Sequence, residues 1–225
     1  VMEKKTLLID ADPQANATSG LNFDPDTDST RTLYEVLIGD RTFEEVTLDT
    51  EIADLKLVPS HINLVGAEIE MLNIPQRELI LRNILEQIRD DYDYIFIDCS
   101  PSLGLITINA LTASNSVIIP VQCEFFALEG IAKLLNTIKI IKSKLNPSLQ
   151  IEGFLLTMFD NRLRLSHQVY NEVKRHFGNL VFDSVIARNV RLSEAPSHGL
   201  SVLDYDFNSK GAQSYIKLAK ELLAR

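Results

Sequence analysis

The sequence has no apolar run that approaches the roughly 20 residues needed to cross a membrane. Residues 1–5 are polar and basic, and the apolar stretch behind them is too short for a signal peptide. These two absences exclude a membrane-spanning helix and a secretory leader. They predict a soluble, cytosolic protein.

Cysteine is scarce, with Cys99 and Cys123 as the two in the chain. Each follows an apolar, strand-like run, and neither has another Cys or a His at the spacing of metal ligands. The pattern argues against a zinc site and favours reduced, partly buried thiols over a disulfide.

Positive charge is also not in excess, because the formal net charge is −9. This argues against a generally basic nucleic-acid-binding protein. The distribution is uneven: residues 1–129 carry 8 Lys and Arg against 23 Asp and Glu, whereas residues 130–225 carry 14 against 8. The second part can offer a local basic face, although solvated helix surfaces explain the same counts.

What the chain does have is 225 residues with 45 % hydrophobic content, ample for one buried core. Strand-like apolar runs alternate with amphipathic segments, without an internal repeat. We expect strands at 6–9, 55–59, 94–98, 116–121, 151–157 and 184–187, and helices at 32–38, 43–46, 62–72, 77–88, 105–113, 127–144, 166–177 and 209–225. This order predicts a single α/β domain over residues 1–225, with a doubly wound, mostly parallel sheet flanked by helices.

Two carboxylates, Asp10 and Asp12, directly follow the first predicted strand. In open α/β sheets, ligands bind beyond the carboxyl ends of the strands, and an extended backbone would put both carboxylates on one side. The alternative is that Asp12-Pro13 forms an ordinary turn.

A third acid, Asp98, ends the apolar run 94–97. An acid at the end of a fully buried parallel strand is the Walker B arrangement, which holds a magnesium-bound water in nucleoside triphosphatases. A polar cap on a strand gives the same pattern. Further along, Arg162 and Arg164 lie in one polar loop, and the basic loop 188–199 follows.

Together these motifs resemble the ParA/Soj family of chromosome- and plasmid-partitioning ATPases, relatives of the MinD cell-division regulators. The resemblance covers nearly the whole chain, and its motifs occur in the family's order. They are Leu8-Ile9-Asp10-Ala11-Asp12-Pro13-Gln14 with Asn16-Ala17-Thr18-Ser19-Gly20, then Asp93-Tyr94-Ile95-Phe96-Ile97-Asp98, then Pro120-Val121-Gln122-Cys123-Glu124-Phe125-Phe126-Ala127-Leu128-Glu129-Gly130, then Arg188 to Gly199. The resemblance implies a P-loop NTPase type of fold.

It also implies roles for matching residues. Asp12 is similar to the second acid of the family's Walker A′ motif, which binds near the nucleotide and orients the water that attacks the γ-phosphate. Asp98 is similar to the Walker B acid that reaches magnesium through water. Arg188 and Asn189 match the loop that lies against the nucleotide base and ribose.

The resemblance further implies that Arg162 and Arg191 face DNA when two subunits close over ATP, helped by Arg164 and the lysines of the last helix. Contacts of this kind go to phosphates and need no base readout. Surface arginines that serve only solubility are the alternative.

The implied activity is ATP hydrolysis with ATP and Mg²⁺ by a cytoplasmic, nucleoid-associated protein. It would dimerise with ATP, bind DNA nonspecifically and respond to a ParB-like partner. It would not associate with a membrane. Two alternatives stay open: a MinD-like membrane-associated ATPase, and a non-catalytic remnant that acts as a binding module.

The main departure from the family is a missing Gly-x-x-x-x-Gly-Lys-Ser/Thr phosphate-binding loop. We therefore expect an N-terminally truncated domain that lacks the first strand, exposes two strand edges and binds ATP poorly. Smaller departures are Ala15 where the family often has Gly, Ser100 where it often has Pro, and Ala187 where Pro is common.

Overall fold

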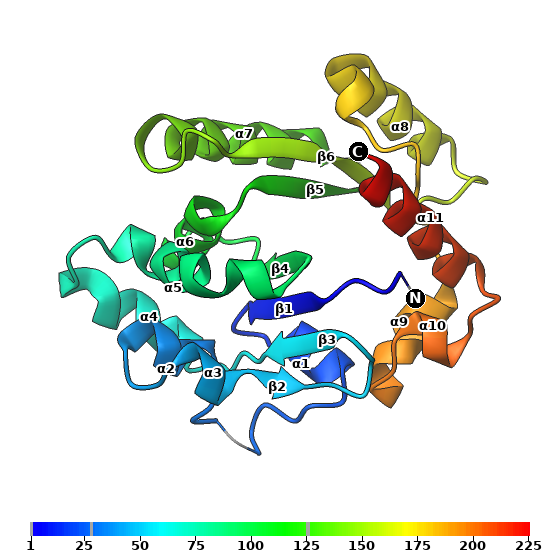
Figure 1. Cartoon of the computed structure of the whole chain (residues 1–225). Helices are drawn as coiled ribbons and strands as arrows, with labels where there is room; N and C mark the ends of the chain where they lie inside the picture. Colours follow the sequence, from blue (N-terminus) through cyan, green and yellow to red (C-terminus); the bar gives the residue numbers. More distant parts are fainter. Residues whose placement is uncertain (1, 28, 125–126) are drawn as a thin grey trace. The chain divides into compact units, whose positions relative to one another are not determined.

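The computed structural model of the chain describes residues 2–27, 29–124 and 127–225 (Figure 1). Val1 and the Phe125-Phe126 pair of the third motif lie outside the described residues. The chain divides into two compact units, and each is described by itself. Unit 1 comprises Val1–Ser114 and Lys144–Pro147, and unit 2 comprises Asn115–Ser143 and Ser148–Arg225. The interpretation as a single domain stays a prediction.

Unit 1 contains a four-stranded sheet in the order β2-β3-β1-β4. Its strands are β1 (Thr6–Ala11), β2 (Leu48–Asp49), β3 (Leu55–Val58) and β4 (Tyr94–Cys99). β1 pairs in parallel with β3 and β4, and the short β2 runs antiparallel to β3 (Figure 1). The predicted fold class, an α/β fold with a mostly parallel sheet, is confirmed.

Helices follow the strands of unit 1. They are α1 (Asn16–Gly20), α2 (Leu33–Ile38), α3 (Phe43–Val46), α4 (Leu64–Glu70), α5 (Ile80–Ile88) and α6 (Leu105–Ala113), with single 3₁₀ turns η1 (Met71–Asn73), η2 (Arg77–Leu79) and η3 (Arg89–Asp91). α2 and α3 begin where threonines form capping boxes with glutamates three residues later, Thr32 with Glu35 and Thr42 with Glu45.

The core of unit 1 lies between β1 and these helices. Leu7 and Ile9 of β1 are 0 % exposed and pack with buried residues of α2, α4 and α5 such as Leu33, Leu64 and Leu81. Each such side chain contributes about 1.5–3 kcal/mol when it leaves water. This packing fixes the end of β1, where the predicted carboxylates lie.

β4 is the last strand of its sheet among the described residues, with β1 as its paired neighbour. Phe96 of β4 is 40 % exposed. β4 is therefore not the fully buried strand that its apolar run indicates, because one of its edges carries no strand among the residues described, and this open edge agrees with the expectation of an exposed strand edge.

Unit 2 contains the parallel pair β5 (Ser116–Gln122) and β6 (Gln150–Thr157). Its helices are α7 (Ala127–Lys144), α8 (Arg164–Phe177), α9 (Val190–Glu194), α10 (Val202–Tyr205) and α11 (Lys210–Ala224), with 3₁₀ turns η4 (Gly178–Leu180) and η5 (Ala195–His198). The last residue of α7, Lys144, begins the second segment of unit 1. No described helix is both long and apolar enough to cross a membrane.

Three predictions for unit 2 are wrong. Residues 184–187 form no strand, because Ala187 makes only an isolated bridge with Phe159. The basic loop 188–199 contains α9 and η5. Arg164 begins α8 instead of lying in the preceding loop.

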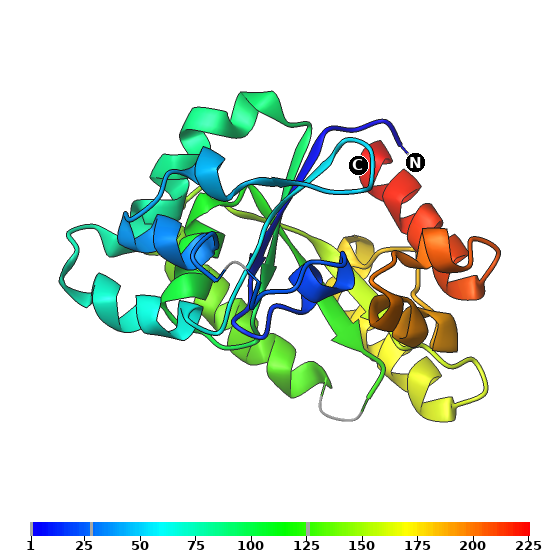
Figure 2. The ribbon, with the colours of Figure 1, turned by 90° about the horizontal axis from the view of Figure 1, so that it is seen from below.

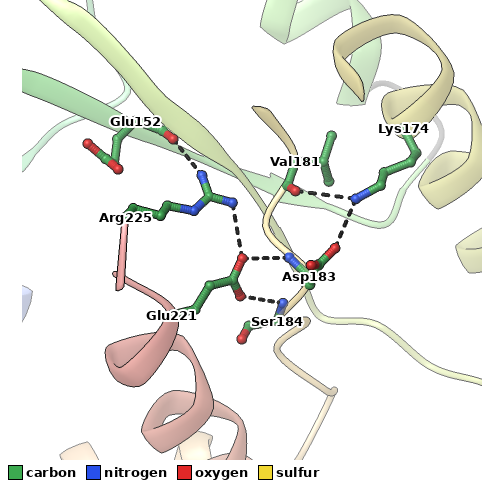
Figure 3. A network of polar contacts seen from close by, with 7 residues as sticks. All are labelled: Glu152, Lys174, Val181, Asp183, Ser184, Glu221 and Arg225. Carbon is green, nitrogen blue, oxygen red and sulfur yellow. Dashed lines mark hydrogen bonds and ion pairs between the residues drawn. The ribbon is translucent and has the colours of Figure 1, made fainter. Parts of the chain in front are cut away.

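A polar network ties the end of α11 to the rest of unit 2 (Figure 3). Glu221 accepts hydrogen bonds from the backbone N–H groups of Asp183 (2.8 Å) and Ser184 (2.7 Å). Arg225 donates to Glu221 (3.0 Å) and to the carbonyl of Glu152 in β6 (2.7 Å). One ion pair therefore fixes a helix, a strand and a loop that are far apart in the sequence.

Candidate active site

The two acid motifs of unit 1 meet at the carboxyl ends of adjacent strands. β1 extends past Ile9 to include Asp10, and Asp10 is the register partner of Asp98 on β4. Asp12 follows Ala11, in the turn between β1 and α1. In Figure 2 the dark blue ribbon of β1 leads through this turn into the dark blue helix α1. Parallel pairing therefore brings the three acids to one edge of the sheet, although Asp98 is remote from the other two in the sequence.

Asp10 is 0 % exposed. Its Oδ1 accepts the backbone N–H of Asp12 (3.1 Å), and its Oδ2 accepts both the backbone N–H (2.8 Å) and the hydroxyl (2.7 Å) of Thr18. Every partner donates, so Asp10 is bound as the carboxylate acceptor. It joins the end of β1 to α1.

Asp12 is half-buried and lies in the turn that the sequence predicts as the alternative to a ligand site. Its Oδ1 accepts the N–H of Gln14 (3.0 Å), and its carbonyl accepts the N–H of Ala15 (2.9 Å). Ala15 is 2 % exposed with φ +52°, the left-handed region that glycine adopts without strain. This geometry explains why a glycine suits the position, and it makes the turn and the acid site compatible interpretations.

The local electrostatics favour a cation. Burial is the main cause that raises the pKa of Asp10, and hydrogen bonds from Thr18 only partly offset it. Burial of its carboxylate, followed by the charges of Asp10 and Asp12, raises the pKa of Asp98. A positive ion near these acids would relieve that repulsion.

The donor chemistry fits magnesium, which takes carboxylate oxygens and keeps several waters. Among the described residues, no three His, Cys, Asp or Glu side chains gather closely enough to hold a metal by themselves. Asp98 keeps surface in contact with solvent, although neighbouring protein atoms partly desolvate its carboxylate, and it therefore suits a ligand that acts through water. Water and a nucleotide would have to supply most of the shell.

Two of the predicted DNA-binding arginines in unit 2 are paired with acids. Arg162 donates from Nε (3.0 Å) and Nη2 (2.7 Å) to the two carboxylate oxygens of Asp160, while its side chain stays 87 % exposed. These hydrogen bonds hold the pKa of Asp160 well below its usual range.

Arg191 contacts Glu194 (2.8 Å) and Asp206 (3.2 Å), and it lies over the ring of Tyr205. Arg164 is exposed, and the structure gives it no ion pair among the described residues.

The predicted nucleotide-loop residues lie at the start of α9. Asn189 is its N-cap, with Oδ1 accepting the N–H of Arg191 (3.0 Å), so its side-chain oxygen is engaged. Arg188 is exposed beside it, and its backbone N–H donates to Phe159 (2.9 Å). The structure brings these two together but does not place them relative to the acids of unit 1.

Sequence reasoning missed several residues that hold this site. Thr18 occurs in the first motif, but nothing in the pattern shows that its hydroxyl also accepts the N–H of Ser60 (3.0 Å). The acids that pair with the arginines, Asp160 and Glu194, were missed as well. A carboxylate two or three residues from an arginine is the signal that could have found them.

Comparison with known proteins agrees with the fold and the motifs. A family profile described as "AAA domain" matches residues 1–151. The chain is 51% identical over 221 residues to the sporulation initiation inhibitor protein Soj of Bacillus subtilis, covering 98% of this chain and 87% of that protein. It is 50% identical over 223 residues to the chromosome partitioning protein ParA of Myxococcus xanthus, covering 99% and 78%.

A solved structure with a similar fold holds a nucleotide. The crystal structure named as cobyrinic acid a,c-diamide synthase from Mycobacterium smegmatis, with a bound ATP analogue and magnesium, matches with a TM-score of 0.84 and 34% identity over 98% of this chain and 82% of that one. Its name differs, whereas the two relatives at about 50% identity are named ParA and Soj. The chain belongs to the ParA/Soj family of chromosome-partitioning ATPases.

Proposed function

We propose that this protein is the ATPase of a DNA-partitioning system, in which ATP closes a homodimer that binds DNA without sequence preference. A ParB-like partner stimulates hydrolysis and release. The observation that carries the proposal is the convergence of Asp10, Asp12 and Asp98 at the carboxyl ends of β1 and β4. The 50% identity to a protein named as a chromosome partitioning protein supports the same conclusion.

In this proposal Asp12 is the catalytic residue. Its carboxylate is half-buried, fixed in a turn and able to accept a hydrogen bond from the attacking water, which orients that water toward the γ-phosphate. Asp98 holds magnesium through water. When bound, the metal neutralises charge on the phosphate oxygens.

In this proposal the contacts to the nucleotide base, the ribose and DNA belong to unit 2. Arg188 and Asn189 would lie against the base and ribose, with the Asn189 amide group as donor. Arg164 is the best-placed DNA contact, because no described acid neutralises it. Arg162 and Arg191 would have to exchange their carboxylate partners for phosphates.

The proposal needs a phosphate-binding loop, for which the printed sequence has no motif. We propose that the loop and its strand complete one domain with residues 1–225. The coding sequence upstream of the codon for Val1 shows whether such a loop is encoded, and activity is tested in the protein as encoded in full.

The test is retention of nonspecific duplex DNA by the full protein with and without ATP and Mg²⁺, at several salt concentrations. We expect retention that requires ATP and falls steeply with salt, since Lys and Arg contacts to phosphate release counterions. Retention that is equal without nucleotide would instead support the non-catalytic binding module. A protein that binds anionic vesicles and not DNA would support the MinD-like alternative.

A further inference from the structure

We propose that Thr18 is a positioning residue for Asp12, acting through the carboxylate of Asp10. This inference rests on the proposed function, because it concerns the same hydrolytic site. Thr18 touches neither nucleotide nor water in the proposal, and its effect on the reaction is transmitted through the turn that carries Asp12.

Asp10 holds the turn at both of its ends. Oδ1 binds the N–H of Asp12, where the turn begins, and Oδ2 binds the N–H and hydroxyl of Thr18 in α1, where it closes. Asp10 and Thr18 are both 0 % exposed, so no water competes for these bonds. The backbone position of Asp12 is therefore fixed from one buried carboxylate.

The hydroxyl of Thr18 connects a third segment of the chain to the turn that carries Asp12. It accepts the backbone N–H of Ser60 (3.0 Å), which lies just beyond β3, and so it must use its own hydrogen toward Asp10 (2.7 Å). Serine and threonine can accept and donate at once in this way, whereas valine, with the same shape, can do neither. Both hydrogen bonds therefore depend on the hydroxyl oxygen of residue 18 and not on the shape of its side chain.

Removing that oxygen would affect both neighbours. The N–H of Ser60 would be buried without an acceptor, and Oδ2 of Asp10 would lose its hydroxyl donor. Ala15 offers the turn a way to move, because its left-handed φ of +52° is strained for alanine and relaxes if the closing bond weakens. A shift of Asp12 by about 1 Å is enough to lower turnover about 100-fold.

The experiment compares ATP turnover of Thr18→Val, Thr18→Ser and Asp12→Ala in the protein as encoded in full. Thr107→Val is the matched control, because Thr107 is a buried threonine of unit 1 whose hydroxyl donates to a carbonyl, that of Ser102 (2.7 Å), away from Asp10. Rates are normalised to the folded fraction of each variant.

We expect Thr18→Val to lower kcat about 10- to 100-fold while KM for ATP changes less than about threefold, since Asp12 is displaced and the nucleotide contacts are kept. Thr18→Ser should restore kcat to within about threefold of wild type. Thr107→Val should lower the melting temperature without lowering kcat.

A Thr18→Val enzyme with the kcat of Thr107→Val would overturn the positioning role. If Thr18→Val does not fold, Asp10→Asn is measured in its place. An NH2 group at the position of Oδ2 cannot accept the two hydrogen bonds that Thr18 donates to Asp10. An unchanged kcat of Asp10→Asn would overturn the inference equally. Failure of the proposed function looks different, since Asp12→Ala would then hydrolyse ATP normally.

Discussion

Asp10 in unit 1 and Glu221 in unit 2 are carboxylates that connect segments of the chain in the same way, but their pKa values are shifted in opposite directions. Each accepts two backbone N–H groups and so joins segments of its unit. Glu221 also pairs with Arg225, whereas no Lys or Arg pairs with Asp10 among the described residues. The difference shows which of the two is adapted to structure alone.

The pKa directions follow from this difference. Burial raises the pKa of Asp10 despite its hydrogen bonds. Burial also works to raise the pKa of Glu221, but hydrogen bonds from the side chain and backbone of Ser184, from the backbone N–H of Asp183 and from the guanidinium of Arg225 outweigh it, and the pKa is lowered. A buried negative charge without a local cation suits a site that must attract magnesium, while a neutralised one suits a permanent tie.

The largest expected effect is at Gly153 in β6, beside which the guanidinium of Arg225 packs. A Cβ there would lie 2.6 Å from the ring of Phe182, 2.7 Å from the carbonyl of Leu180 and 2.8 Å from Nη1 of Arg225. We expect Gly153→Ala to lower the free energy of unfolding by about 3 kcal/mol, measured by urea titration. Gly130→Ala is the control: outside its own helix backbone and its chain neighbours, no described atom lies within 4 Å of the added Cβ, and helix propensity predicts stabilisation of up to about 1 kcal/mol.

Next in size is Glu221→Gln, which removes the charge from the network in Figure 3. The side chain of Glu221 is 20% exposed, and we expect a loss of about 2 kcal/mol in unfolding free energy. Glu172→Gln, on an exposed ion pair with Arg175, should change it by less than about 0.5 kcal/mol. Equal losses in the two variants would contradict a special role for Glu221.

The pH dependence should separate the two carboxylates by sign. Because the folded pKa of Glu221 is lowered, its contribution is present above the ordinary value of 4.5 and is lost as pH falls through the folded pKa. Because the folded pKa of Asp10 is raised, its contribution is greatest below 3.8 and is lost as pH rises through the folded pKa.

Urea titrations of wild type, Glu221→Gln and Asp10→Asn between about pH 3 and 7 measure this difference. The stability gap between wild type and Glu221→Gln should shrink as the solution is acidified. For Asp10→Asn, wild type should lose stability relative to the variant as pH rises. Slopes of one sign in both comparisons would contradict the contrast.

The smallest effects concern DNA contacts of unit 2. Arg164→Ala should weaken DNA retention by the full protein more than Arg162→Ala does, because Asp160 already neutralises Arg162. Each lost phosphate contact lowers the slope of log affinity against log salt by about 1. A larger effect of Arg162→Ala would show that its ion pair opens on DNA.

Much of the fold follows from the sequence where segments are long. The helices at 105–113 and 127–144 have the predicted bounds, since apolar periodicity over several turns leaves little choice. The two-residue β2 and the short α1, α9 and α10 were not predicted, because their few residues do not stand out from the surrounding loops, whereas the equally short α3 was predicted with its observed bounds. The strand at 184–187 failed because residues of strand-like composition found only an isolated bridge.

The candidate site was predictable only where a local sequence pattern marks its residues. The position of an acid after an apolar run identifies Asp12 and Asp98, but the register that pairs Asp98 with Asp10 comes from packing of the whole sheet. The contact of Thr18 with Ser60 joins loops that no local pattern links. The roles assigned to the site residues stay predictions.

The most direct measurement is phosphate release in a single turnover by the Asp12→Ala variant of the full protein, with ATP-dependent DNA retention followed in parallel. We predict that hydrolysis is lost while ATP still drives DNA retention, because Asp12 orients water and does not hold the phosphates. Phosphate release at the wild-type rate would contradict the assignment of Asp12 as the catalytic residue.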